Sequence, residues 1–277
     1  MVQILITADT GSGSKDQYLV AESMQNLLKK YNKINDVFLL GDNIYETGVT
    51  SVNDKQFKTK FEDPYKKINK KFHLCLGNHD YGNSYFPTDI YQHQIEYTKL
   101  SNKWNLPQRY YNLVRSPCEF FFLDTNFDMM SESVIMKQFH DIKNMIQNSN
   151  QKWKILCGHH TWRCIGGHGN AEKRHERFMQ DLLNVVGFDL YMCGHDHCKN
   201  IIKTKKRKKN IHSLVIGTGG KKYDESLVYL KNLKIDDSEL LFHSPNLGAC
   251  VLEATKKNIK LTCYNEETRQ ECSIILN

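Results

Sequence analysis

Five short apolar runs along the chain each stop at a polar segment whose side chains are common metal ligands. Apolar runs that stop near glycine are typical of buried parallel strands, and ligands in open α/β sheets bind beyond the carboxyl ends of such strands. The runs are residues 4–6, 37–40, 72–76, 155–157 and 190–193, and the segments after them read Ala8-Asp9-Thr10-Gly11, Gly41-Asp42-Asn43-Ile44-Tyr45, Gly77-Asn78-His79-Asp80, Gly158-His159-His160 and Gly194-His195-Asp196-His197. We therefore expect five strand ends to deliver carboxylates, imidazoles, an amide and a phenol to one crevice.

The segments between these strands carry a helical pattern. Apolar residues recur with helical spacing in residues 16–31, 134–147 and 172–186, which predicts three amphipathic helices. Strands that alternate with helices are typical of a layered α/β protein. After Gly217-Thr218-Gly219-Gly220 the pattern changes to strands at residues 249–254, 259–264 and 272–276, which we expect to form a second sheet packed on the first.

Length and composition fit one α/β domain that spans residues 1–277. Hydrophobic residues make up 40% and charged residues 25% of the chain, as in ordinary soluble proteins. No apolar run approaches the ~20 residues that cross a membrane. Because the first predicted strand follows Met1 at once, we expect no secretory signal. The nine cysteines are an odd and scattered set, so a disulfide framework is the weaker interpretation. We expect a reducing, cytoplasmic location and no membrane partner.

The formal net charge of +7 is densest in residues 203–209, which read Lys-Thr-Lys-Lys-Arg-Lys-Lys. Two interpretations of this segment stay open. It is either the solvated tip of a hairpin or a functional segment, which would serve nuclear import or contact an anionic polymer such as nucleic acid. The first interpretation is favoured.

The polar residues at the strand ends outnumber the ligands of one metal ion and suit a pair of ions. Asp42 is the natural bridging ligand, because one carboxylate can bind both cations of a close pair. With the period of two of an extended segment, His195 and His197 point the same way, so each can reach a different ion. The seven expected ligands are Asp9, Asp42, Tyr45, Asn78, His159, His195 and His197.

Tyr45 indicates which ions these are. A phenolate is an anionic oxygen donor that favours a hard trivalent ion, so we expect Fe(III) on its side, and Zn, Fe or Mn as the divalent partner. The three anionic ligands leave such a pair positively charged and ready to attract an anion. Because two close metal ions clamp the attacking and leaving oxygens of an in-line displacement, phosphate ester hydrolysis is the expected reaction.

The order and spacing of these motifs resemble the calcineurin-like metallophosphoesterases, and most of all the purple acid phosphatases of the small, tartrate-resistant acid phosphatase type. The resemblance covers roughly residues 2–216 and includes Gly41-Asp42-Asn43-Ile44-Tyr45-Glu46-Thr47-Gly48-Val49, Phe61-Glu62-Asp63, Trp104-Asn105-Leu106-Pro107 and Leu123-Asp124-Thr125. It implies a four-layer α/β/β/α sandwich with two packed mixed sheets. It also implies Fe(III) on Asp9, Asp42, Tyr45 and His197, and the divalent ion on Asp42, Asn78, His159 and His195.

The resemblance further implies that the protein hydrolyses phosphate monoesters through a metal-bound hydroxide. His79 and His168 match substrate-facing histidines of the family and are the candidate general acids. Asn78 and His160 are expected to join them in binding the substrate, which would be a small phosphorylated molecule or a phosphoprotein. The family is mostly secreted or lysosomal, in contrast to the cytoplasmic location expected above. The alternatives are a phosphodiesterase or nucleotide phosphatase on the same metal site, and a binding protein that has lost catalysis.

Overall fold

The computed structural model describes residues 1–82, 89–206, 209–222, 234 and 238–276 and contains two seven-stranded sheets. The strands are β1 (Val2–Thr7), β2 (Ile34–Leu40), β3 (Lys71–Cys75), β4 (Trp104–Asn105), β5 (Tyr111–Arg115), β6 (Cys118–Phe122), β7 (Trp153–Cys157), β8 (Leu190–Cys193), β9 (Lys199–Lys205), β10 (Asn210–Ile216), β11 (Ser238–Ser244), β12 (Gly248–Ala254), β13 (Ile259–Asn265) and β14 (Gln270–Leu276). The first sheet has the order β14-β13-β12-β1-β2-β3-β4, and the second has the order β11-β9-β10-β8-β7-β6-β5. Both sheets mix parallel and antiparallel pairs, as the sequence predicts.

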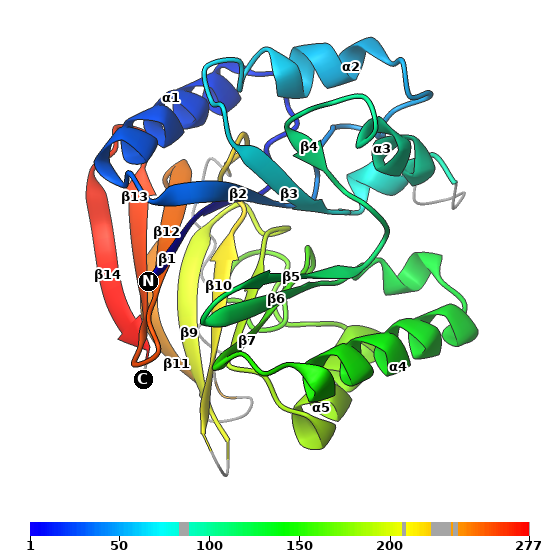
Figure 1. Cartoon of the computed structure of the whole chain (residues 1–277), viewed down its shortest axis with the longest axis vertical. Coiled ribbons are helices and arrows are strands. Elements are labelled where there is room, and N and C mark those ends of the chain that lie inside the picture. The colour runs from blue at the N-terminus through cyan, green and yellow to red at the C-terminus, as the bar shows by residue number, and fades with distance from the viewer. Residues whose placement is uncertain (83–88, 207–208, 223–233, 235–237, 277) are drawn as a thin grey trace.

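The helices form the two outer layers. They are α1 (Lys15–Lys30), α2 (Lys55–Phe57, continued by a π-helical turn at Lys58–Glu62), α3 (Tyr91–Tyr97), α4 (Glu132–Asn148) and α5 (Lys173–Val185). The helices α1, α2 and α3 lie outside the first sheet, and α4 and α5 lie outside the second (Figure 1). The four-layer prediction is therefore confirmed, and α1, α4 and α5 match the three predicted helices within two residues at each end. No helix in the described ranges has the length and apolar character needed to span a bilayer.

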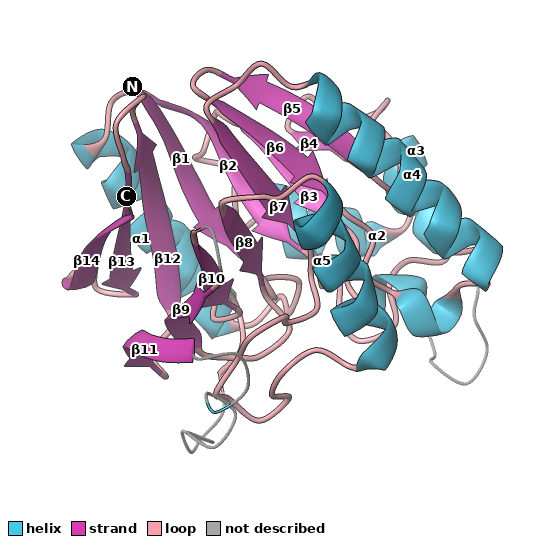
Figure 2. Ribbon diagram, turned by 90° about the horizontal axis from the view of Figure 1, so that it is seen from below, coloured by secondary structure: helices cyan, strands magenta, loops and turns pink. Residues whose placement is uncertain are grey.

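The C-terminal strands correct the expected arrangement of the sheets. The strands β12, β13 and β14 form where the sequence predicts strands, but they do not build the second sheet. Instead β12 pairs antiparallel with β1, with Leu252 opposite Ile4, and β13 and β14 continue the first sheet outward. The second sheet is built from residues 111–244 (Figure 2). Both ends of the chain consequently lie close together at the first sheet.

The two sheets share a core of large apolar side chains. Phe38 of β2 packs edge-on against Phe120 and Phe122 of β6, with ring centroids 4.9 and 5.0 Å apart. A second cluster lies on the other face of the second sheet, where Ile142 of α4 and Phe178 of α5 cover it. Because both faces of the central strands are buried, those strands read as continuous apolar runs in the sequence.

One disulfide joins neighbouring strands of the first sheet. Cys250 of β12 and Cys263 of β13 are register partners and are disulfide-bonded, whereas the other seven cysteines form no disulfide. The scattered spacing of the cysteines gives no hint of this pair. Disulfides are typical of oxidising compartments, so this bond weighs against the expected reducing location.

Candidate metal centre

Five strands from both sheets end around one site. Parallel strands present their carboxyl ends at the same edge of a sheet, which is where polar residues can meet. Asp9 follows β1, Asp42 and Tyr45 follow β2, Asn78 follows β3, His159 follows β7, and His195 and His197 follow β8. The contacts below show that the structure brings all seven predicted ligands together.

The first group of side chains surrounds the carboxylate of Asp9. The Tyr45 hydroxyl donates to Asp9 Oδ1 at 3.0 Å, and His197 Nε2 lies 3.5 Å from the same oxygen. The Tyr45 oxygen and His197 Nε2 are 3.2 Å apart. A carboxylate oxygen, a phenol oxygen and an imidazole nitrogen thus point at one another in a buried place.

The second group surrounds the side-chain oxygen of Asn78. His159 Nε2 and His195 Nδ1 each lie 3.1 Å from Asn78 Oδ1 and 3.3 Å from each other. His159 Nδ1 is 2.9 Å from the carbonyl oxygen of Leu40 and must donate to it. In the neutral ring, this leaves Nε2 as the unprotonated nitrogen that a metal requires.

Asp42 connects the two groups. Its Oδ1 atom is 3.3 Å from His159 Nε2, and one ligand atom from each of Asp9, Asp42 and His159 lies within 4.8 Å of the others. His195 contacts the Asn78 group and His197 contacts the Asp9 group, as expected. The reason differs from the predicted one, however, because residues 194–198 lie between β8 and β9 and His195 has a left-handed φ of 69°.

Backbone strain and close packing hold these ligands in place. Asp9 and Asp42 have φ angles of 58° and 51°, and such non-glycine residues cost of order 1–3 kcal/mol each and cluster at functional sites. Gly41 also has a positive φ, of 85°, and a Cβ there would lie 2.4 Å from His159 Nδ1. A Cβ at Gly77 would lie 2.1 Å from Asp42 Oδ1. Both glycines are therefore needed for the ligands to approach each other.

The electrostatics of the site favour bound cations. Asp9 and Asp42 are 0% and 2% exposed, although burial of a carboxylate is costly without a compensating positive charge. Burial opposes ionisation of Asp42, but the neighbouring histidines, His159 first, hold its pKa well below the ordinary value. Burial and then the charges of Asp9 and Asp42 raise the pKa of Tyr45 well above the ordinary value. Two buried carboxylates, a phenol, an amide oxygen and three imidazoles fit a pair of metal ions, which would neutralise the carboxylates and favour the phenolate.

His79 lies on the Tyr45 side of the site. Its ring centroid is 4.5 Å from that of Tyr45, and its Nε2 atom is 3.9 Å from Asp42 Oδ2. Its Nδ1 atom contacts the carbonyl oxygen of Glu46 and must donate to it. The Nε2 atom of His79 therefore lies toward Asp42. Because the side chain is only half-buried, it is also accessible from solvent.

His168 and His160 lie on the opposite side, next to His195. Their ring centroids are 4.1 and 4.5 Å from the His195 ring, respectively. His160 Nδ1 is 2.9 Å from the hydroxyl oxygen of Thr125, and burial followed by the neighbouring histidines lowers its pKa well below the ordinary value. These surroundings favour the neutral form of the His160 ring.

A cavity of about 380 Å³ opens beside this second group of ligands. Asn78, His160, His168 and His195 line it together with Asn170, Arg174 and residues 125–129. Three of the four predicted substrate-binding residues thus face one cavity, and the fourth, His79, lies across the metal centre from it.

Asp80 is a residue of the site that the sequence analysis missed. It is fully buried, and its carboxylate accepts hydrogen bonds from the backbone N–H groups of Gly77, Asn43 and Ile44 and from the side chains of Asn43 and Gln94. These bonds join the segment that carries Asp42 and Tyr45 to the segment that carries Asn78. The position of Asp80, two residues after the predicted ligand Asn78, is the feature of the sequence that hints at a role in the site.

Comparison with known proteins assigns the chain to a family. The family model of the calcineurin-like phosphoesterases matches residues 2–199. The chain belongs to the calcineurin-like phosphoesterase family. The chain is 29% identical to purple acid phosphatase 17 of Arabidopsis thaliana over 95% of this chain and 81% of the relative. It is also 29% identical to tartrate-resistant acid phosphatase type 5 of Sus scrofa, over 82% of this chain and 71% of the relative.

One solved structure with a similar fold belongs to a protein that is not described as a phosphatase. GAP50, the anchor in the inner membrane complex of Plasmodium, superposes with a TM-score of 0.81 at 21% identity and covers 100% of this chain and 88% of that chain. At this identity the likeness concerns the fold. The comparisons confirm the predicted kinship with purple acid phosphatases and the prediction of a metal-dependent phosphoric ester hydrolase.

Proposed function

We propose that this phosphoesterase is a dinuclear-metal phosphatase that hydrolyses phosphate monoesters. The observation that supports this proposal best is the division of the seven ligands into two groups that share Asp42. When bound, two ions would activate water and neutralise the charge that develops on a phosphoryl group in flight. The cavity beside His168 has room for a small phosphorylated substrate rather than for a folded partner.

The two groups differ in the ions they suit. The first group holds two carboxylates and a phenol oxygen, which favour a hard trivalent ion such as Fe(III). The ligands of this ion would be Asp9, Asp42, Tyr45 and His197. The second group holds imidazoles and an amide oxygen with the shared carboxylate, and it suits divalent Zn, Fe or Mn. The ligands of this ion would be Asp42, Asn78, His159 and His195.

The histidines around the metal ligands would handle the substrate. The Nδ1–H of His79 is held by the Glu46 carbonyl while its Nε2 atom lies toward Asp42, so the doubly protonated ring can give its Nε2 proton to a leaving alcohol and become the neutral Nδ1–H form. His168 stands at the cavity and would orient the phosphate from the other side. His160 would contact the substrate as a neutral ring. Asn78 would hold both an ion and the substrate.

Aryl phosphate hydrolysis with metal analysis tests this proposal. We expect two metal ions per chain and turnover of an aryl phosphate monoester at acid pH. A His79→Ala variant should lose at least about 100-fold in kcat, as befits a general acid, while keeping both ions. His140→Ala changes an exposed histidine outside the site and serves as the matched control. One ion per chain, or full activity of His79→Ala, would contradict the proposal.

The Fe(III) assignment has its own test. A phenolate bound to Fe(III) absorbs visible light, so the iron-loaded protein should be coloured and Tyr45→Phe colourless. A colourless wild-type protein with two ions and activity near neutral pH would remove Fe(III) but keep the phosphoesterase.

A diesterase acting on polyanions is the second candidate, and the basic segment at residues 203–209 is the feature that favours it. Arg207 and Lys208 lie outside the described residues, and the strands β9 and β10 on either side pair antiparallel. Lys203 pairs with Glu239 at 2.6 Å and Lys209 with Asp189 at 3.0 Å, so two of these charges are already compensated. We therefore rank the monoesterase first. Faster turnover of an aryl diester than of the monoester would reverse this order.

The cellular location remains a prediction. The disulfide between Cys250 and Cys263 is the structural observation that concerns it. A cytoplasmic protein would keep Cys250 and Cys263 as thiols, whereas the structure joins them. Thiol alkylation in intact cells followed by mass analysis distinguishes the two states.

A binding protein without catalysis would keep its biological effect in the His79→Ala variant.

A further inference from the structure

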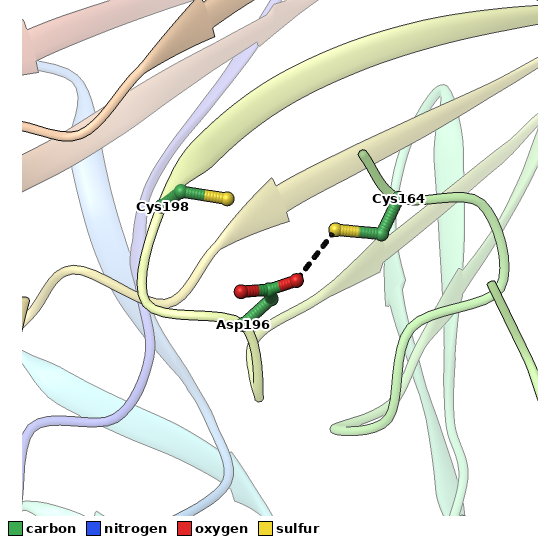
Figure 3. A group of neighbouring side chains, drawn as sticks. All are labelled: Cys164, Asp196 and Cys198. Carbon is green, nitrogen blue, oxygen red and sulfur yellow. Dashed lines mark hydrogen bonds between the residues drawn. The ribbon is translucent and has the colours of Figure 1, made fainter. Parts of the chain in front are cut away.

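A second cluster of metal-binding side chains lies directly behind the ligands His195 and His197. Between and after these histidines the chain places Asp196 and Cys198, which contact Cys164 instead of the metal centre (Figure 3). One ligand atom from each of these three residues lies within 4.8 Å of the other two. Cys164 and Asp196 are fully buried and Cys198 is 4% exposed.

The spacing of this cluster suits a tetrahedral ion. Zinc binds thiolate sulfur at about 2.3 Å and carboxylate oxygen at about 2.0–2.2 Å, so its ligand atoms lie roughly 3.3–3.8 Å apart. The Cys164 sulfur is 3.0 Å from Asp196 Oδ2. Small rotations of these side chains would therefore bring them to an ion without moving the backbone.

The surroundings of the two sulfur atoms are those of metal-bound thiolates. The backbone N–H of Gly166 donates to Cys164 Sγ at 3.3 Å. The side-chain amide of Asn200 donates to Cys198 Sγ at 3.1 Å and reaches Cys164 Sγ at 3.6 Å. Donors aimed at sulfur stabilise a thiolate and orient the ligand around a metal.

The carboxylate of Asp196 supplies an independent observation. Its Oδ2 atom accepts a hydrogen bond from Cys164 and from the backbone N–H of His168, at 3.0 and 3.1 Å. Its Oδ1 atom is buried and has no hydrogen-bond partner among the described residues. A buried carboxylate oxygen without a partner is costly, and a cation beside it removes that cost.

A fourth ligand is at hand on β11. The ring of His243 is in hydrogen-bonding contact with the thiol of Cys198. Two thiolates, one carboxylate and one imidazole would supply the four ligands of a tetrahedral zinc ion, with the carboxylate in the place that a second histidine takes in Cys2His2 sites.

We propose that Cys164, Asp196, Cys198 and His243 bind one zinc ion, distinct from the two ions of the catalytic centre. The ion would fix the loop at residues 164–168, which carries His168, against the segment that carries His195 and His197. It would act as a structural brace of the active site. The proposal does not depend on phosphatase activity.

Cobalt substitution tests this site without interference from the catalytic centre. The seven ligands of that centre include no sulfur, so a thiolate-to-Co(II) charge-transfer band in the near ultraviolet reports the proposed site alone. We expect one equivalent of Co(II) to produce this band in the wild-type protein and in Tyr45→Phe. The double variant Cys164→Ser/Cys198→Ser should lack the band and bind one ion fewer per chain. Cys272→Ser, a half-buried cysteine of β14, is the control and should keep both.

X-ray absorption at the zinc edge of the wild-type protein keeps the proposal testable if the double variant does not fold. Sulfur neighbours at about 2.3 Å from zinc would support it. A zinc spectrum with nitrogen and oxygen neighbours alone would overturn it. A peptide that links Cys164 to Cys198 through a disulfide in an unreduced digest would overturn it as well.

Discussion

The Asp80 carboxylate ties two ligand-bearing segments together, and the change Asp80→Asn measures how much this tie contributes. An asparagine keeps one oxygen and turns the other into a donor. If the oxygen takes the Oδ1 position, the amide group faces the N–H of Gly77 and the side chain of Asn43, now 2.8 and 3.1 Å away. If it takes the Oδ2 position, the amide group faces the N–H of Ile44 and the side chain of Gln94, at 3.2 and 2.8 Å.

Either orientation leaves at least two buried donors without an acceptor, namely the new amide group and the N–H of Gly77 or of Ile44, whereas the side chain of Asn43 keeps the carbonyl oxygen of Cys75. Each such group costs about 1–3 kcal/mol, so Asp80→Asn should lower the free energy of unfolding by about 2–6 kcal/mol. This is a large part of the total stability of a typical domain, which is ~5–15 kcal/mol. Because the bonds position Asp42 and Asn78, we also expect weaker binding of both ions, by about 10–100-fold as for other residues that orient metal ligands.

Urea unfolding of the chelator-treated protein, followed by tryptophan fluorescence, measures the change in the free energy of unfolding without a contribution from metal binding. Asp63→Asn is the matched control, since Asp63 makes a surface ion pair with Lys58 and its side chain is 37% exposed. The control should stay within about 0.5 kcal/mol of the wild type. A loss below about 1 kcal/mol in Asp80→Asn, with unchanged metal affinity, would refute the role of Asp80 as a clamp.

Three further predictions concern packing and pH. Gly41→Ala should displace His159, whose Nδ1 atom would lie 2.4 Å from the new Cβ, and lower kcat at least about ten-fold with loss of one metal ion on elemental analysis. Burial opposes ionisation of Asp36, but its hydrogen bonds, with His73 first and then with Arg115, lower its pKa to about 2. Asp36→Asn should therefore cost at most about 2 kcal/mol at pH 7 in urea unfolding, since Arg115 is partly exposed, and this difference should shrink as the pH falls from 4 toward 2. Burial, with the charge of a nearby lysine, lowers the pKa of His212 to about 4, so protonation favours the unfolded state. The protein should lose up to about 3 kcal/mol as the pH falls from 6.5 to 4, and His212→Gln should lose less in the same titration.

The seven predicted ligands could be chosen from the sequence because each follows a buried strand. A carboxylate or an imidazole at such a place has little structural use, so five of these segments in one chain indicate a site. The parallel strands themselves are visible as apolar runs because both of their faces are buried. The sequence immediately around Asp9, Asp42 and His159 is therefore sufficient to predict them as metal ligands.

Strand pairing is different because it depends on contacts far along the chain. The apolar run at residues 249–254 predicts β12 as a strand but does not say that its partner is β1, about 250 residues earlier. Either edge of either sheet would satisfy the hydrophobic pattern of β12. The observed choice buries Leu252 beside Ile4.

Asp80 and the cysteine cluster escaped prediction for a related reason. An aspartate in a turn and a cysteine in an apolar segment each have an ordinary structural role, so their chemistry carries no signal alone. Cys164 and Cys198 become a candidate site when the loop after β7 folds over residues 194–198, and Asp80 becomes a clamp when the ends of β2 and β3 meet. The sequence thus predicts the residues that would touch the metal ions of the catalytic centre, whereas the residues that hold those ligands in position emerge with the tertiary fold. A variant library restricted to the seven predicted ligands would accordingly miss the positions that control the geometry of the centre.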